Sequence, residues 1–129
     1  MLEKPYLRPT YDEPEFVVRN VWRLYGGWYD GNPAHLKPAP ELALSREVAS
    51  LAGGARALAE RAREVADGGD LRLACELAEW AGLAAPEDRS VHGIRAEIYK
   101  QRRKSELSLM ARGIYGDASR RSQAIAERE

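Results

Sequence analysis

Residues 58–86 of the chain read LAERAREVADGGDLRLACELAEWAGLAAP, and this stretch decides the fold class. Its small and apolar residues recur three or four positions apart on both sides of Gly68-Gly69, which is the spacing of amphipathic helices. The glycine pair is a stop for the first helix, and Asp70 is an N-cap residue for the second. The second helix carries alanines on one side, which let a neighbouring helix approach closely. The stretch therefore predicts an antiparallel helical hairpin.

The same helical spacing continues on both sides of the hairpin, so we predict an all-α fold, a bundle of about five to six helices. The hairpin resembles a tetratricopeptide repeat, but no second copy follows at that period. Asp12 and Glu15 form a capping-box-like pair before the first helix. Helices are expected over residues 16–29, 41–51, 55–67, 71–83, 87–104 and from 105 or 106 onward, the last interrupted at Gly113 or Gly116. No segment alternates with a period of two, so no strand is expected.

Composition excludes several classes of protein. The chain has 129 residues, 44% of them hydrophobic, with 20 basic against 20 acidic residues and one cysteine. This length fits one domain with a core of its own. Zero net charge disfavours a nucleic-acid binder, one cysteine forms no internal disulfide, and no apolar run reaches the ~20 residues of a membrane helix. We expect one soluble, cytoplasmic domain that binds neither nucleic acid nor membranes.

Residues that carry catalysis or bind metals are sparse. His35, His92 and Cys75 are isolated from one another, so their spacing forms no zinc site. We expect His35 in a loop, His92 at a surface or an interface, and Cys75 as a small buried hydrophobe. No serine lies in a nucleophile motif. The sequence therefore predicts no catalytic residue and no metal ligand in this chain.

A basic cluster lies near the end of the helix expected over 87–104. It contains Lys100, Arg102, Arg103 and Lys104, with Arg95 about a turn earlier. Basic residues at the end of a helix complement the helix dipole, and this is the preferred interpretation. The alternative is a surface that meets an anion or an acidic partner.

An aromatic segment is the most distinctive feature of the sequence. Trp22, Tyr25, Trp28 and Tyr29 fall within eight residues, just before Asp30-Gly31-Asn32-Pro33-Ala34. Aromatic side chains with a polar atom are favoured at protein interfaces and pocket rims. Core packing of a helix with a wide apolar face is the alternative.

The residues YGGWYDGNPA at 25–34 resemble the signature of the dimerisation domain of alkyl sulfatases, enzymes with a metallo-β-lactamase fold. Residues 41–54, 62–85 and 90–101 are similar to the helices that follow in that domain. The resemblance covers about residues 14–121, between an extended lead-in at 1–13 and a polar tail at 122–129. In relatives the domain joins a hydrolase domain with a binuclear zinc centre to a sterol-carrier-like domain.

The resemblance implies a homodimer and not an enzyme, because the H-x-H-x-D-H zinc motif of the hydrolase domain is absent from this sequence. We expect no cofactor in this chain and a partner that is a second copy, with a separate or upstream metallo-β-lactamase-fold domain as a further partner. A full-length relative would hydrolyse alkyl sulfate esters, with Tyr29 and Asn32 on the substrate side. The alternative is a stand-alone helical-repeat adaptor that binds a peptide along residues 58–86. The interface candidates are Val18, Trp22, Tyr25, Trp28, Leu109 and Tyr115.

Overall fold

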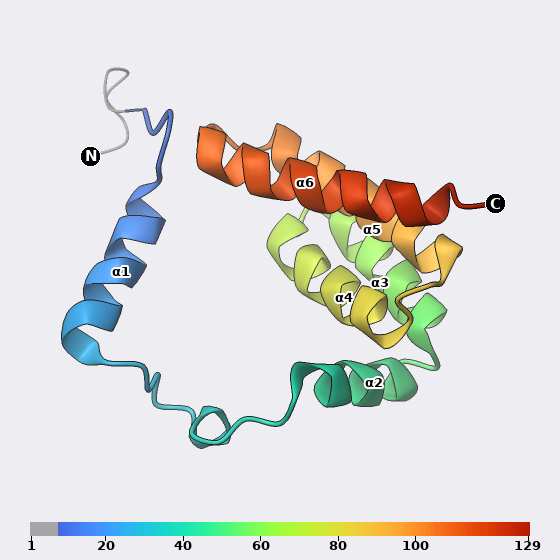
Figure 1. Ribbon diagram of the computed structural model, residues 1–129, viewed down its shortest axis with the longest axis horizontal. Helices are drawn as coiled ribbons and strands as arrows, with labels where there is room; N and C mark the ends of the chain where they lie inside the picture. Colours follow the sequence, from blue (N-terminus) through green and yellow to red (C-terminus); the bar gives the residue numbers. More distant parts are fainter. Residues whose placement is uncertain (1–7) are drawn as a thin grey trace.

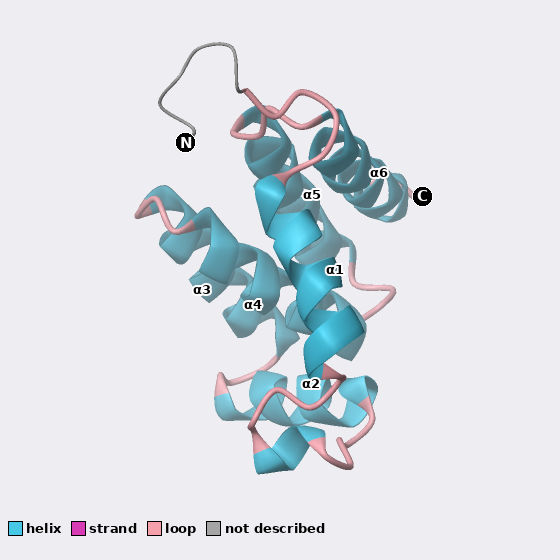
Figure 2. Cartoon of the chain, turned by 90° about the vertical axis from the view of Figure 1, so that its left-hand side faces the viewer, coloured by secondary structure: helices cyan, strands magenta, loops and turns pink. Residues whose placement is uncertain are grey.

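The structure, a computed structural model, describes residues 8–129, and all regular structure within them is helical (Figures 1 and 2). This confirms the all-α prediction. Residues 1–7 of the expected lead-in lie outside the described part, and residues 8–13 are not helical. The elements are α1 (Pro14–Gly26), the short 3-10 helix η2 (Pro33–His35), α2 (Glu41–Leu51), α3 (Ala55–Asp67), α4 (Leu71–Ala84), α5 (Arg89–Lys104) and α6 (Leu109–Ala126).

The predicted hairpin forms from α3 and α4. Gly69 turns the chain with a φ of 97°, a conformation that favours glycine, and the Asp70 side chain then accepts a hydrogen bond from the Leu73 N–H at 3.0 Å. Ala62, Ala74, Ala78 and Ala81 are 0–1% exposed. Because these side chains are small, α3 and α4 pack closely and place the centre of the core at their junction.

The remaining bundle helices build outward from this hairpin. One core cluster joins Ala49 of α2 to Leu58, Ala81 and Val91, and a second places Ile98 of α5 among the alanines of the hairpin. α5 packs on both hairpin helices, and α6 packs along α5. Tyr99 of α5 and Tyr115 of α6 stack with ring centroids 5.9 Å apart, and this contact aligns the two helices along one another.

α6 differs from the prediction in both its start and its continuity. Ser108 caps the helix by accepting the Ala111 N–H, so α6 begins at Leu109 and not at 105 or 106. It then continues without a break through Gly113 and Gly116. Gly116 has a tertiary role, since a Cβ there would lie 3.1 Å from Arg103 Cδ on α5. Residues 122–126 of the expected tail extend α6, and Ser122 is fully buried.

α1 also differs from the prediction, because it ends at Gly26 and leaves Trp28 and Tyr29 in the following loop. Gly27 ends the helix with a φ of 79°. Gly26 stays helical because its missing side chain makes room for Trp22, whose Cε2 would be 3.0 Å from a Cβ. The Asp12–Glu15 capping box does not form, since Glu13 is the N-cap residue and Asp12 accepts only the Glu13 N–H.

Among residues 8–129, α1 packs against no other helix. Figure 1 shows α1 standing apart from the bundle, joined to α2 by the extended segment 27–40 that contains η2. The segment contains three prolines, which keep it extended. The fold thus consists of a five-helix bundle and a helical arm.

Candidate functional site

The side of α1 that faces its own bundle carries two charged residues, Glu15 and Arg19, beside the partly buried Phe16. The Glu15 carboxylate accepts hydrogen bonds from Nη1 and Nη2 of Arg72 on α4, at 3.1 and 2.9 Å. It also accepts a bond from Arg19, one turn later, at 3.0 Å. Arg72 lowers the pKa of Glu15 through this hydrogen bond and its charge. Glu15 and Arg19 therefore mark the inner side of the arm.

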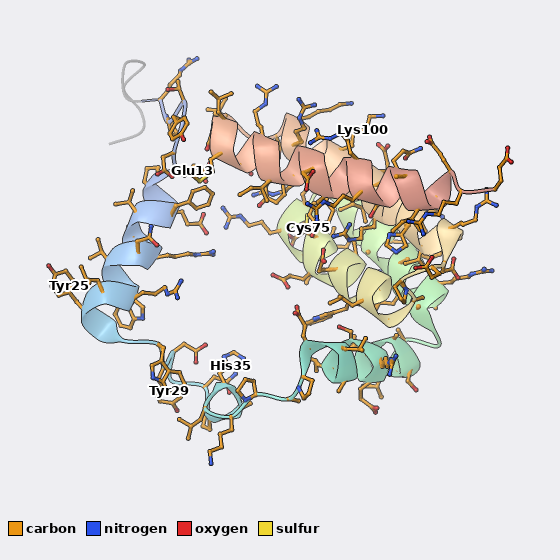
Figure 3. All side chains as sticks on the ribbon, in the orientation of Figure 1. Glu13, Tyr25, Tyr29, His35, Cys75 and Lys100 are labelled. Carbon is orange, nitrogen blue, oxygen red and sulfur yellow. The ribbon has the colours of Figure 1, made fainter. Side chains whose placement is uncertain are left out.

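The opposite side of α1 is apolar and uncovered. Six side chains on it are between 51% and 83% exposed: Val17, Val18, Val21, Trp22, Leu24 and Tyr25. At 3.6 residues per turn these positions form one wide stripe. Val17, Val21 and Leu24 lie opposite Glu15 and Arg19, whereas Trp22 lies at the edge of the stripe that is nearest to them. Figure 3 shows Tyr25 pointing away from the bundle. All but Leu24 line a shallow hollow of about 440 Å³ together with Gly26. We call these six residues the outer stripe.

The arm is fixed to the bundle at its N-terminal end. The carbonyls of Thr10 and Tyr11 accept the N–H groups of Leu109 and Met110 at 2.9 and 3.1 Å, and the buried Ser108 hydroxyl donates to Tyr11 at 2.8 Å. These bonds satisfy first-turn donors of α6 that would otherwise lack a backbone partner. The attachment sets the direction in which the outer stripe points.

A cleft of about 320 Å³ separates the inner side of α1 from α4, α5 and α6. Glu13, at the start of the arm, has its pKa raised by burial and by Glu106. Cys75 lines the cleft half-buried, and burial raises the pKa of its thiol to about 11. Figure 3 marks Glu13 and Cys75 on the two sides of this region. A thiol with a raised pKa is a poor nucleophile, as expected for a structural cysteine.

The loop after α1 is held by its own polar residues. Asp30 Oδ2 contacts His35 Nδ1 at 2.5 Å, and Asn32 caps η2 by accepting the Ala34 N–H at 3.1 Å. The Asn32 N–H and His35 lower the pKa of Asp30. Trp28 and Tyr29 meet edge to face at 6.1 Å. His35 is thus the last residue of η2, within the segment that connects α1 to α2.

The structure groups some of the predicted site residues and separates others. Val18, Trp22 and Tyr25 share the outer stripe, whereas Trp28 is 70% exposed in the loop. Leu109 is 61% exposed at the start of α6. Tyr115 is half-buried against Tyr99, on a different side of α6. Tyr29 is partly exposed, and Asn32 has the capping role described above.

A polar network between α4, α5 and α6 was not predicted. Arg95 pairs with Glu79 and donates to the buried Ser122 hydroxyl at 2.6 Å, and Tyr99 also donates to Glu79. His92 Nδ1 lies 3.1 Å from the same Ser122 hydroxyl. His92 is only 6% exposed, where α5 packs on α6, so of the two predicted placements, a surface or an interface, the surface is wrong. Its burial depends on Ser122, 30 residues later, which no local pattern reveals.

Possible metal ligands are dispersed over residues 8–129. Within residues 8–129, no group of three or more His, Cys, Asp and Glu side chains converges as metal ligands. The two histidines are engaged separately, His35 in its loop and His92 in the network. Within the same residues, no helix has the length and apolar character needed to cross a membrane.

A search against protein-family models matches residues 1–124 to the alkyl sulfatase dimerisation family. The chain belongs to this family. An (R)-specific secondary-alkylsulfatase of a Pseudomonas species is 34% identical over 98 residues, which are 76% of this chain and 15% of that protein. A linear primary-alkylsulfatase, also of Pseudomonas, is 28% identical over 86% of this chain and 21% of its own length.

Solved structures agree with the family assignment of this dimerisation domain. A double mutant of the sec-alkyl sulfatase PisA1 superposes with a TM-score of 0.85 at 29% identity, covering 93% of this chain and 19% of that one. The stereoselective inverting sec-alkylsulfatase Pisa1 from Pseudomonas superposes with a TM-score of 0.82 at 28% identity, covering 95% and 19%. The chain therefore spans about a fifth or less of the relatives it matches.

Proposed function

We propose that this dimerisation domain forms a homodimer through the outer stripe of α1. The observation that carries the proposal is the orientation of the arm, which turns Glu15 and Arg19 toward its own bundle and leaves the six residues of the outer stripe uncovered, with the middle of the stripe turned away from the bundle. Soluble monomers rarely leave an apolar stripe of this kind exposed. Such a patch on a protein surface marks an interaction site. Tyr and Trp are also the residues most enriched among interface hot spots.

The adaptor alternative has less support. It requires the hairpin to expose a groove along residues 58–86. Leu58 and Ala62 are instead 3% and 0% exposed, in the core, so this face of the hairpin is not available to a peptide. The family match likewise favours self-association.

The test of the homodimer is sedimentation equilibrium of the purified chain and of single variants. Tyr25→Asp and Val18→Asp place a charge on residues that are 83% and 66% exposed, so the fold of the protomer tolerates them. In a two-fold interface each change acts twice, and we expect the dissociation constant to rise at least about 100-fold. Leu51→Asp is the matched control, because Leu51 is 81% exposed on α2. A wild-type chain that stays monomeric at tens of micromolar would overturn the proposal.

We further propose that the dimer supports a metallo-β-lactamase-fold domain, on the same or a separate chain, that holds the zinc and hydrolyses alkyl sulfate esters. The names of the matched alkylsulfatases support this role. Tyr29 and Asn32, in the loop after the arm, would then face the substrate. The test is to measure sulfatase activity and bound zinc for this chain alone and for this chain together with such a domain. We expect both only when the hydrolase domain is present. Stoichiometric zinc in this chain alone would contradict it.

A cytoplasmic location is a separate proposal, supported by the single cysteine, which forms no disulfide within the chain. Immunodetection in fractionated cells tests it. Recovery of the protein in a periplasmic or secreted fraction would contradict it.

A further inference from the structure

A second surface feature lies on α6, away from the outer stripe. Leu109, Gly113, Gly116 and Arg120 follow one another at helical spacing and form one face. The side chain of Arg103 on α5 crosses this face at Gly116. A hollow of about 280 Å³ results, lined by Arg103, Leu109, Arg112, Gly113 and Arg120.

The hollow gathers positive charge. A Cβ on Gly116 would lie 3.2 Å from Arg103 Nε and 3.4 Å from Arg120 Nη1, so both guanidinium groups lie next to Gly116. Asp117 is shared between Arg121 at 2.7 Å and Arg120 at 3.4 Å. Within residues 8–129, Arg103 and Arg112 have no ion-pair partner within 4.0 Å. Arg103 and Arg112 line the same hollow without such a partner, so their charges repel one another, and an anion in the hollow would relieve this repulsion.

An exposed apolar side chain belongs to the charged hollow. Leu109 lines it at 61% exposure, and Leu107, 63% exposed, lies two residues earlier in the chain. An inorganic ion would leave these side chains uncovered. A ligand with an anionic head and a hydrocarbon tail would use both parts of the surface.

We propose that this face of α6 binds a linear alkyl sulfate monoester, with its sulfate group between Arg103 and Arg112 and its chain along Leu109. Guanidinium groups bind tetrahedral oxyanions through paired charge-assisted hydrogen bonds. The choice of an alkyl sulfate rests on the proposed function, which supplies the ligand class. The site itself does not include the outer stripe, so binding and dimerisation can be measured separately.

The test is titration calorimetry at low ionic strength with hexyl sulfate kept below its micelle concentration, alongside inorganic sulfate and hexanol. Hexyl sulfate is expected to bind more tightly than either, since each buried methylene strengthens binding by up to about fourfold. Arg103→Gln combined with Arg112→Gln is expected to weaken binding at least about tenfold, because charged hydrogen bonds are lost. Sedimentation on the same samples reports the oligomeric state.

Arg46→Gln is the matched control. Arg46 is exposed on α2 beside the exposed Leu42 and Leu44, without a converging arginine, and its loss is expected to leave binding unchanged. Gly116→Ala is a second test that keeps every charge, because the added Cβ displaces Arg103 and is expected to weaken binding.

Three results would overturn the inference. They are unchanged affinity in the double variant and in Gly116→Ala, equal weakening in Arg46→Gln, and inorganic sulfate binding as tightly as hexyl sulfate. A monomer that still binds hexyl sulfate through Arg103 and Arg112 would contradict the homodimer and support the α6 site. A dimer that does not bind hexyl sulfate would support the homodimer and contradict the α6 site.

Discussion

Arg95 on α5 and Glu79 on α4 form a two-pronged ion pair, with Arg95 Nη2 2.7 Å from Glu79 Oε2 and 3.0 Å from Oε1. The Arg95 side chain is only 15% exposed. The same guanidinium reaches Ser122 on α6, and Tyr99 donates to Glu79 at 2.7 Å. The mostly buried guanidinium of Arg95 therefore links α4, α5 and α6.

Glu79→Ala is expected to lower the free energy of unfolding by about 3 kcal/mol, because removal of one partner leaves a mostly buried guanidinium unpaired. The Tyr99 hydroxyl also loses its acceptor. Urea denaturation followed by circular dichroism measures the change. Glu76→Ala, one turn earlier on the exposed side of α4, is the control and is expected to change stability by less than about 0.5 kcal/mol. Equal effects of the two changes would contradict the role of the pair.

His92 is expected to make stability depend on pH between about 5 and 7. Burial, and then the charge of Arg95, lower the pKa of His92 from its ordinary 6.5. Above pH 6.5 the imidazole is neutral in both the folded and the unfolded chain. As the pH falls below 6.5, the unfolded chain takes up a proton that the folded chain resists, so stability decreases. The slope is at most about 1.4 kcal/mol per pH unit for one proton.

His92→Gln removes this titration, so its stability curve is expected to be flatter than that of the wild type over the same range. Urea denaturation at pH 5, 6 and 7 gives the comparison, and the other titrating groups are the same in both proteins. His35→Gln is the control, because His35 is exposed in its loop. Parallel curves of stability against pH for the wild type and His92→Gln would rule out His92 as the source of the pH dependence.

Cys75 is expected to react slowly with alkylating reagents in the folded protein. Its pKa is raised from 9.0 to about 11, so at pH 8 the thiolate is about 100-fold scarcer than in the unfolded chain. Reaction with iodoacetamide, followed by mass spectrometry with and without urea, measures the difference. Similar rates in the two states would show that the thiol is not desolvated.

The sequence could predict those elements whose determinants are local. The turn at Gly69-Asp70 and the alanine face of α4 specify the α3–α4 hairpin from neighbouring residues alone, and the structure confirms it. The end of α1 was harder to place. Trp28 and Tyr29 continue the helical spacing beyond Gly27, and only the backbone conformation of Gly27 shows that the helix has ended.

Other features depend on contacts between distant residues. Gly116 suggests a helix break when seen alone, but it is explained by Arg103 crossing over it from α5. The direction of the outer stripe depends on Thr10 and Tyr11 binding the start of α6. The aromatic spacing therefore indicated an interface or a core, and the attachment of the arm leaves these side chains outside the core of the bundle.

Two helical glycines are expected to respond in opposite directions to the same substitution. Gly93 lies in the middle of α5, and a Cβ there would meet no atom within 4 Å. Gly93→Ala is therefore expected to raise the free energy of unfolding by about 0.5–1 kcal/mol, because alanine restricts the unfolded chain and favours the helix.

A Cβ on Gly82 of α4 would lie 3.0 Å from Arg95 Cδ and 3.7 Å from His92 Cε1. Gly82→Ala would displace Arg95 from Glu79, so we expect a loss of about 1–3 kcal/mol despite the better helix propensity. Thermal and urea denaturation of both variants check the pair, and a gain in stability for Gly82→Ala would show that Arg95 adjusts without cost.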